Sequence, residues 1–204
     1  MDDLKWADAR AAYYHHVHID GRGKNEPHWR GIRVVKFPSD LIQYAQVIQK
    51  NKPTTIIETG TAFGGSALFL ADMLTLNEGL SQVVTIDINN RHNLSDPRIH
   101  VVQGSSTDPS VYEKVKGLAA GRVMVVLDSD HSGHHVFKEL QMYSKLVTKG
   151  QFIVVEDCYT KSERPYGPHW GVRQFLKRTK SFRLEPVEDQ FIFAVTRGGW
   201  LRRI

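Results

Sequence analysis

The order of short apolar runs and helical segments constrains the fold of this chain more than any other feature. The runs are rich in Val and Ile, and each is followed by a segment with helical spacing of apolar residues. Strands that are apolar on both faces and alternate with helices form a parallel sheet covered on both sides. The predicted strands are 54–59, 82–88, 99–104, 123–129 and 151–157, and the predicted helices are 40–51, 64–76, 110–120, 134–147 and 169–179.

The two last apolar runs, 182–186 and 191–197, are separated by only four residues. This spacing predicts a hairpin, which places an antiparallel element at the edge of the sheet. The expected fold is therefore an α/β sheet of seven strands with a reversed last strand. Such a sheet binds ligands at the carboxyl ends of its strands.

The opening segment, residues 1–38, is rich in His, Gly and aromatic residues and has weak periodicity. We expect little regular structure in it beyond a short helix near its start. The main domain is expected to span residues 39–204, and Ser39 is expected to cap its first helix. The opening segment and the loop 159–168 are expected to cover the site that binds the substrate.

Composition limits the classes of protein and partner. The chain has 204 residues with a net charge of +5, and its basic residues are spread out, so we expect no nucleic-acid partner. No apolar run approaches the roughly 20 residues that span a bilayer, and the acidic start lacks the apolar core of a secretory signal. A single cysteine, Cys158, predicts a buried side chain and a reducing, cytoplasmic location. The sequence leaves open whether the chain forms a homo-oligomer.

A glycine-rich turn follows the first predicted strand, in the segment Glu58-Thr-Gly-Thr-Ala-Phe-Gly-Gly-Ser66. Gly60 permits a tight turn and close approach of a ligand, and Gly64 and Gly65 open the next helix. The spacing G-x-x-x-G-G differs from the G-x-G-x-x-G of dinucleotide-binding proteins and lacks the Lys of a phosphate-binding loop. Because Glu58 places a carboxylate beside this turn, a cationic ligand such as S-adenosylmethionine is favoured over NAD.

Asp87 ends the second predicted strand, 29 residues after Glu58. In an α/β sheet, an acid at this position accepts hydrogen bonds from the paired hydroxyls of a ribose. The alternative interpretation is a helix cap or a turn residue.

Acidic residues follow two other strands that are expected to be neighbours. Asp128 and Asp130 end the fourth strand together with His131, and Glu156 and Asp157 end the fifth. Four carboxylates at one edge of a sheet repel one another unless a cation neutralises them. An all-oxygen ligand set favours Mg²⁺, with Ca²⁺ or Mn²⁺ as alternatives. One of these acids is expected to cap a helix or turn instead.

His131 is the first candidate for a general base, because the pKa of histidine lies near neutrality. His134 and His135 begin the next predicted helix and are expected to line the same rim, with His134 as the second candidate base. A surface role is the alternative for each of them.

Four segments resemble the family that contains CmcI-type cephalosporin hydroxylase and the rhamnosyl O-methyltransferases. They are KFPSDLIQYAQVIQKNKPTTIIETGTAFGGSALFLADML, VVLDSDH, LVTKGQFIVVEDC and PYGPHWGVRQFL. The similarity runs from about residue 30 to about residue 194. It implies a Rossmann-like class I methyltransferase fold that binds S-adenosylmethionine, and Mg²⁺ held by an Asp and a Glu-Asp pair. The opening segment is shorter than is usual in the family, which leaves the substrate open.

The resemblance also implies individual site residues. The Glu-Asp pair corresponds to Glu156 and Asp157. The third metal ligand is Asp130 by the family's spacing, with Asp128 then near the cofactor, or Asp128 by analogy with other Mg²⁺-dependent O-methyltransferases. The implied cofactor-binding residues are Glu58, Gly60, Thr61, Gly64, Ser66, Asp87, Gly104, Ser105, Ser106 and Asp128.

The implied reaction is Mg²⁺-dependent methyl transfer to a hydroxyl of a small molecule, such as a sugar, a glycoside or another diol-bearing natural product. The alternatives are a hydroxylase-type oxygenase and a non-catalytic protein that binds S-adenosylmethionine. An oxygenase would need two His and one carboxylate around iron, and the sequence offers no well-placed second His. A NAD-dependent dehydrogenase is disfavoured by the missing G-x-G-x-x-G.

Overall fold

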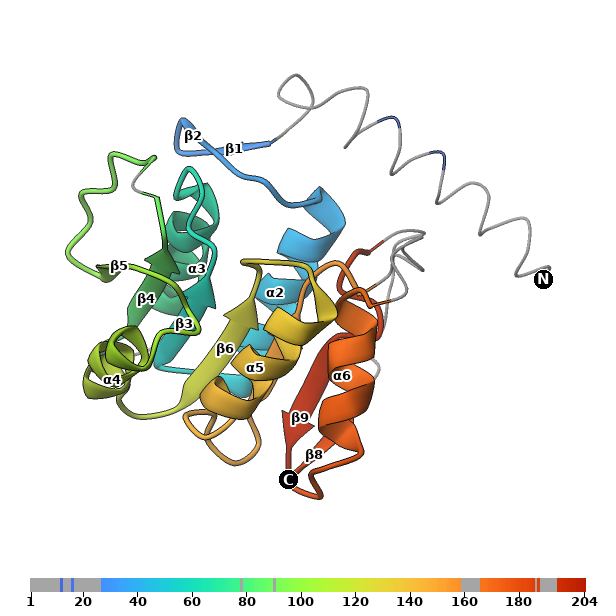
Figure 1. Ribbon diagram of the computed structural model, residues 1–204. Coiled ribbons are helices and arrows are strands. Elements are labelled where there is room, and N and C mark those ends of the chain that lie inside the picture. The colour runs from blue at the N-terminus through green and yellow to red at the C-terminus, as the bar shows by residue number, and fades with distance from the viewer. Residues whose placement is uncertain are drawn as a thin grey trace.

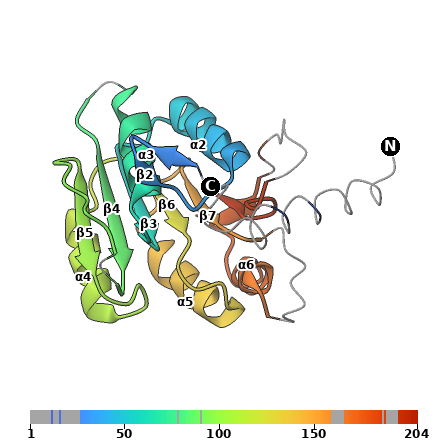
Figure 2. The same ribbon diagram turned by 90° about the horizontal axis from the view of Figure 1, so that it is seen from above.

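A seven-stranded sheet lies between two layers of helices in the computed structural model (Figures 1 and 2). The structure describes Ala12, His16 and residues 27–77, 79–89, 91–158, 166–185, 187 and 194–204. The strands of the sheet are β3 (Thr55–Thr59), β4 (Gln82–Asp87), β5 (Ile99–Gln103), β6 (Val123–Leu127), β7 (Phe152–Val155), β8 (Phe182–Leu184) and β9 (Trp200–Arg203). The helices are α2 (Pro38–Asn51), α3 (Gly65–Thr75), α4 (Pro109–Leu118), α5 (Gly133–Tyr143) and α6 (Pro168–Leu176).

The strand order across the sheet is β5-β4-β3-β6-β7-β9-β8. Strands β3 to β7 are parallel, whereas β9 runs antiparallel to both of its neighbours, β7 and β8. The predicted parallel sheet with a reversed last strand is therefore confirmed. The order reverses direction between β3 and β6, and this switch point is where open α/β sheets bind ligands.

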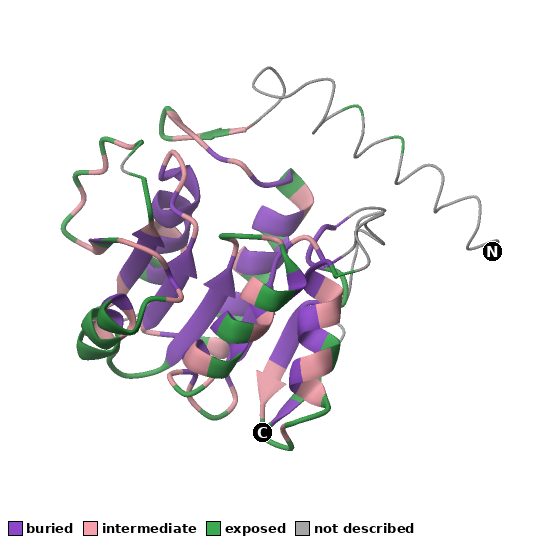
Figure 3. Ribbon diagram, viewed as in Figure 1, coloured by how far each residue is buried: buried purple, intermediate pink, exposed green. Residues whose placement is uncertain are grey.

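Alternate residues of the central strands pack into two separate cores. On β6, Val125 packs in the core beneath α4, α5 and α6, and its neighbours Met124 and Val126 pack in the core beneath α2 and α3. Figure 2 shows these two helix layers on opposite sides of the sheet, and Figure 3 shows that the central strands are buried. Both faces are apolar because side chains alternate across a strand and both faces are covered.

The first main helix begins two residues earlier than expected and without the predicted cap. Helix α2 starts at Pro38 with Phe37 at the N-cap position, and no side chain caps it, so the assignment of Ser39 was wrong. Proline suits the first helical position because its φ is already helical and its missing N–H would have no helical partner there. The Pro residue was therefore the stronger start signal.

The last strand lies later in the chain than predicted. Residues 194–197 do not form a strand, and β9 begins at Trp200; residues 191–193 lie outside the described part of the chain. The backbone N–H groups of Val195 and Thr196 donate to the buried carboxylate of Asp40, at 3.3 and 3.2 Å, and the Thr196 hydroxyl donates to it at 2.8 Å. A side chain thus takes the hydrogen bonds that a sheet ladder would otherwise make.

A small hairpin precedes α2 and was not predicted. Strands β1 (His28–Trp29) and β2 (Ile32–Arg33) pair antiparallel across Arg30 and Gly31, both of which have positive φ. Two left-handed residues form the type of turn that matches the twist of a hairpin. The Trp29 indole donates to Asp72 on α3 at 2.8 Å, which fixes the hairpin to the helix layer.

The described helices contain none that is both long and apolar enough to cross a bilayer. The short helix expected near the start of the chain lies outside the described residues. The role of residues 1–38 as a cover for the site, and the boundary at residue 39, stay predictions.

Candidate active site

The glycine-rich turn after β3 lies directly against the end of β6. Gly60 has a φ of 90°, and a Cβ atom on it would lie 2.0 Å from the backbone oxygen of Asp128. Gly64 has a φ of 87° and forms the N-cap of α3. Only glycine adopts this backbone and permits this approach at Gly60. The glycine-rich turn is therefore in direct contact with the end of β6, where Asp128 lies.

Glu58 is fully buried beneath this turn. The Thr85 hydroxyl donates to its Oε2 atom at 2.8 Å, whereas its Oε1 atom has no hydrogen-bond partner within the described residues. Burial raises the pKa of Glu58 to about 7, and nearby Lys36 opposes this rise. A buried carboxylate with an unsatisfied oxygen is costly, and a cationic group on a ligand would satisfy it.

The tips of β4 and β5 complete the side of the site where the predicted cofactor residues lie. Asp87 accepts the backbone N–H groups of Ala62 and Asn89, both at 2.9 Å, so it joins the tip of β4 to the glycine-rich turn. The N–H of Gly104 donates to the backbone oxygen of Asp87 at 2.8 Å. The predicted residues Ser105 and Ser106 follow β5, whereas Thr61 and Ser66 follow β3, and Thr61, Ser66 and Ser106 are buried.

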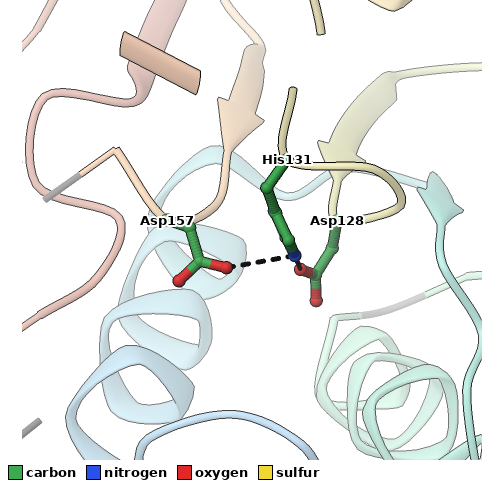
Figure 4. A group of neighbouring side chains, drawn as sticks. All are labelled: Asp128, His131 and Asp157. Carbon is green, nitrogen blue, oxygen red and sulfur yellow. Dashed lines mark ion pairs between the residues drawn. The ribbon is translucent and has the colours of Figure 1, made fainter. Parts of the chain in front are cut away.

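Asp128, His131 and Asp157 gather at the ends of β6 and β7 (Figure 4). Their nearest ligand atoms all lie within 4.8 Å of one another. His131 lies between the two acids, with its Nε2 atom 3.1 Å from Asp157 Oδ2 and 3.9 Å from Asp128 Oδ1. Within the described residues, this is the group of side chains that could hold a metal ion, and its carboxylate oxygens fit a hard divalent cation.

Asp157 reaches this group from a left-handed backbone with a φ of 55°. Such a conformation is uncommon for any residue except glycine, and Asp and Asn tolerate it best. Unusual backbone of this kind often occurs at functional sites.

Glu156 is buried beside the group and holds different partners. Its Oε1 atom accepts hydrogen bonds from the Lys36 ammonium at 2.8 Å and the Tyr44 hydroxyl at 2.6 Å. Lys36 also donates to Asp128 Oδ2 at 2.7 Å. Burial raises the pKa of both Asp128 and Glu156, and the Lys36 charge counteracts that rise.

Lys36 carries its charge although its side chain is only 2% exposed. Burial by itself would lower the pKa of the ammonium, but the surrounding carboxylates outweigh this effect and raise it well above its ordinary value. Sequence reasoning missed both Lys36 and Tyr44. The only available signal was that Lys36 directly precedes the start of a helix whose apolar face contains Tyr44.

Besides Glu156, the structure places two further predicted site residues outside the group of Asp128, His131 and Asp157. Asp130 is exposed and accepts the backbone N–H of Ser132 at 2.7 Å, a bond that lowers the pKa of its carboxyl. His134 is exposed and its ring lies 4.7 Å from that of Trp170 and 5.6 Å from that of Tyr166. Asp130 is thus the acid that serves a local turn.

His135 joins the helix layer to the β5 tip. Its Nε2 atom lies 3.0 Å from the Ser106 hydroxyl and 3.2 Å from the Ser129 hydroxyl, and it pairs with buried Glu139 at 3.6 Å. The nearby Glu139 carboxylate raises the pKa of His135. These contacts hold the Ser105-Ser106 turn in place, and the sequence predicted only that His135 would lie near the rim.

The buried acids predict how stability depends on pH. Burial raises the pKa of Asp40 from 3.8 and of Glu58 from 4.5, in both cases to about 7. The folded state therefore holds more protons than the unfolded state between about pH 4 and pH 7, and its stability falls as the pH rises through this window. Asp72 and Asp96 have lowered pKa values, so their opposing effect lies at lower pH.

We expect the melting temperature of the metal- and cofactor-free protein to fall between about pH 4 and pH 7, which is the window just derived. Thermal denaturation in a series of buffers at constant ionic strength measures this. Glu58→Gln and Asp40→Asn should each flatten the profile, because each removes one group that titrates in the window. A melting temperature that rises over this range would contradict the assignment.

The comparisons with known proteins agree with this fold. The strand order, the reversed β9 and the glycine-rich turn after β3 define a class I methyltransferase fold. CmcI in a structure with Mg and SAM shares that fold, with a TM-score of 0.69 and 21% identity over 87% of this chain and 76% of the CmcI chain. An O-methyltransferase from Bacillus cereus in complex with SAH shares it with a TM-score of 0.59 and 15% identity, over 97% of this chain and 96% of that one.

The particular family follows from the sequence relatives. The family model Rhamnosyl O-methyltransferase/CmcI matches residues 23–204. The rhamnosyl O-methyltransferase of Mycobacterium tuberculosis (strain ATCC 25618 / H37Rv) is 33% identical over 194 residues, which cover 91% of this chain and 76% of the relative. The chain belongs to the rhamnosyl O-methyltransferase/CmcI family, and the resemblance seen in the sequence is confirmed.

Proposed function

We propose that this protein is an S-adenosylmethionine- and Mg²⁺-dependent O-methyltransferase whose acceptor is a small molecule with neighbouring hydroxyls, such as a sugar, a glycoside or another diol-bearing natural product. The observation that carries the proposal is the contact between two sites. Gly60 of the glycine-rich turn packs on the backbone of Asp128, whose side chain belongs to the metal-binding group. Family membership supports the reaction class.

The residues divide into two sets. On the cofactor side, the buried Oε1 atom of Glu58, which has no hydrogen-bond partner within the described residues, would accept a cationic group of the cofactor, and Asp87 would accept the ribose hydroxyls. The other residues proposed for this side are Gly60, Thr61, Gly64, Ser66, Gly104, Ser105 and Ser106.

On the metal side, Asp128 and Asp157 would hold Mg²⁺, with Glu156 as a further ligand. Mg²⁺ bound there would act as a Lewis acid: it would lower the pKa of an acceptor hydroxyl and orient this hydroxyl toward the methyl group of S-adenosylmethionine. The geometry favours Asp128 over Asp130 as the ligand from β6, because Asp130 lies outside the group and bonds to Ser132.

His131 is the proposed general base. Its Nε2 atom is held 3.1 Å from Asp157, and its side chain is 41% exposed, so a substrate can reach the ring. Removal of a proton by a positioned base contributes about 10²–10⁴-fold to such reactions. His134 stays a second candidate.

His134, Tyr166 and Trp170 form an aromatic cluster that is proposed as the acceptor side of the site. Trp170 contacts the rings of both other residues, at 4.7 and 5.6 Å, and 54% of Tyr166 is exposed. Aromatic rings offer a large apolar face with a polar tip, which suits a ring-shaped acceptor with hydroxyls. We propose that the acceptor packs on this surface.

The oxygenase alternative does not fit the group at the strand ends. An iron site of that type uses two His and one carboxylate, whereas the described cluster has one His and two carboxylates. A cytoplasmic location is also part of the proposal, supported by the free and buried thiol of Cys158.

A transfer assay with and without metal tests the proposed function. With S-adenosylmethionine and a panel of sugars and glycosides, we expect a methylated product and S-adenosylhomocysteine in Mg²⁺, no product in EDTA, and full recovery when excess Mg²⁺ is restored. Transfer that continues unchanged in EDTA would overturn the metal site. Calorimetric binding of S-adenosylhomocysteine without any methylated product across diol-rich acceptors would favour the non-catalytic alternative.

A further inference from the structure

We propose that Lys36 is a built-in counter-ion of the metal site, which holds the acids together when the ion is absent and weakens their affinity for it when it is present. This inference rests on the proposed function, because it assumes that Asp128 and Glu156 face a divalent ion. It adds a positioning residue from the segment that precedes the main helix.

The geometry of Lys36 shows how the two carboxylates are shared. The ammonium lies 2.7 Å from Asp128 Oδ2 and 2.8 Å from Glu156 Oε1, so it bridges the tips of β6 and β7. It takes one oxygen of each acid. The other oxygen of Asp128, Oδ1, faces His131 in the group that would hold the ion. Lys36 therefore lies on the inner side of the acids, and the ion would lie on the outer side.

Burial makes this charge important for the metal-free protein. Asp128, Glu156 and Glu58 all act on Lys36, and Glu156 and Lys36 are each only 2% exposed at the side chain. Buried acids of like charge destabilise a fold unless a cation compensates them. The chain supplies that cation itself, at the point where the tips of two parallel strands bring the acids together.

The same charge opposes a second cation. An ammonium within hydrogen-bond distance of two metal ligands repels Mg²⁺, and it also withdraws one oxygen of each ligand from the ion. The affinity for Mg²⁺ is then lower than three free carboxylates would give. Lys36 thus lowers the affinity for Mg²⁺ and at the same time stabilises the site when no metal is bound.

The test compares three variants by calorimetric titration with Mg²⁺ and by thermal denaturation with and without Mg²⁺. Lys36→Met removes the charge and the hydrogen bonds, and Lys36→Gln removes the charge but keeps a donor. Tyr44→Phe is the matched control, because it removes the other hydrogen bond to Glu156 Oε1, at 2.6 Å, without any change of charge.

We expect both Lys36 variants to melt at a lower temperature without metal, to bind Mg²⁺ roughly tenfold or more tightly, and to gain more from Mg²⁺ in melting temperature than the natural protein. Tyr44→Phe should lose stability without metal but keep the natural affinity for Mg²⁺. A purely structural lysine would lower stability without tightening the affinity.

Unchanged or weaker Mg²⁺ binding in both Lys36 variants would overturn the proposal. So would variants that fail to fold even in saturating Mg²⁺, because the ion is expected to replace the missing charge. If the natural protein itself binds no Mg²⁺, then the metal part of the proposed function fails together with this inference; if it binds Mg²⁺ and the variants match it, only the role of Lys36 is wrong.

Discussion

Asp157→Asn is expected to reduce Mg²⁺-dependent methyl transfer by at least about 100-fold, because a metal acting as a Lewis acid contributes several kcal/mol to such a transition state. The substitution removes the charge of the residue that lies 3.1 Å from His131 in the acidic group. Asn is preferred to Ala because position 157 has a φ of 55°, and Asn tolerates left-handed backbone. The variant should therefore fold normally.

Steady-state kinetics at several Mg²⁺ concentrations measure the loss, and calorimetry with S-adenosylhomocysteine measures whether the cofactor side survives. We expect cofactor affinity close to that of the natural protein, because Glu58 and the glycine-rich turn keep their contacts. A variant that retains the natural rate, or one that loses cofactor and metal together, would show that the acids at β7 do not form a separate metal site.

Asp130→Asn is the matched control, and it also separates the two candidates for the ligand from β6. Its carboxylate is exposed and bonds to the Ser132 backbone, a bond that the side-chain oxygen of Asn can also accept. We expect this variant to keep its metal dependence, whereas Asp128→Asn should lose it as Asp157→Asn does. The reverse pattern would restore the assignment that the family's spacing implied.

The strands and the acids at their ends could be predicted because the signal is local. Strand β6 consists of five apolar residues and is followed directly by Asp128, and β7 is followed directly by Glu156 and Asp157. Parallel pairing then brings these tips to one edge. Beyond a strand end the alternation of side chains no longer applies, so the sequence could not decide between Asp128 and Asp130.

Contacts between distant residues could not be predicted. Lys36 donates to Asp128 and Glu156, which lie 92 and 120 residues later in the chain. Sequence periodicity gives no information about contacts between residues so far apart. The predicted position of the last strand was wrong for a similar reason. Residues 194–197 belong to an apolar run, but Asp40, some 155 residues earlier, takes the backbone hydrogen bonds of Val195 and Thr196.

Glu58→Gln is expected to weaken S-adenosylmethionine binding by roughly 100-fold, which corresponds to about 3 kcal/mol for the loss of one charge from a buried pair. The substitution keeps the shape of the side chain and an oxygen that can accept the Thr85 hydroxyl, now 2.8 Å from Oε2. It removes the negative charge of a group that is fully buried beneath the glycine-rich turn. Isothermal titration at pH 8, where the carboxyl with a pKa of about 7 is mostly ionised, is the measurement.

Two ligands and one control variant then identify what Glu58 contacts. S-adenosylmethionine has a positive sulfur and a positive amino group, whereas S-adenosylhomocysteine keeps only the amino group. A greater loss for S-adenosylmethionine would place Glu58 at the sulfur, and an equal loss would place it at the amino group. Asp40→Asn, which removes another buried acid whose pKa is about 7, should leave both affinities unchanged because its partners are Val195 and Thr196. If Glu58→Gln binds both ligands as tightly as the natural protein does, then this buried carboxylate does not select a cationic cofactor.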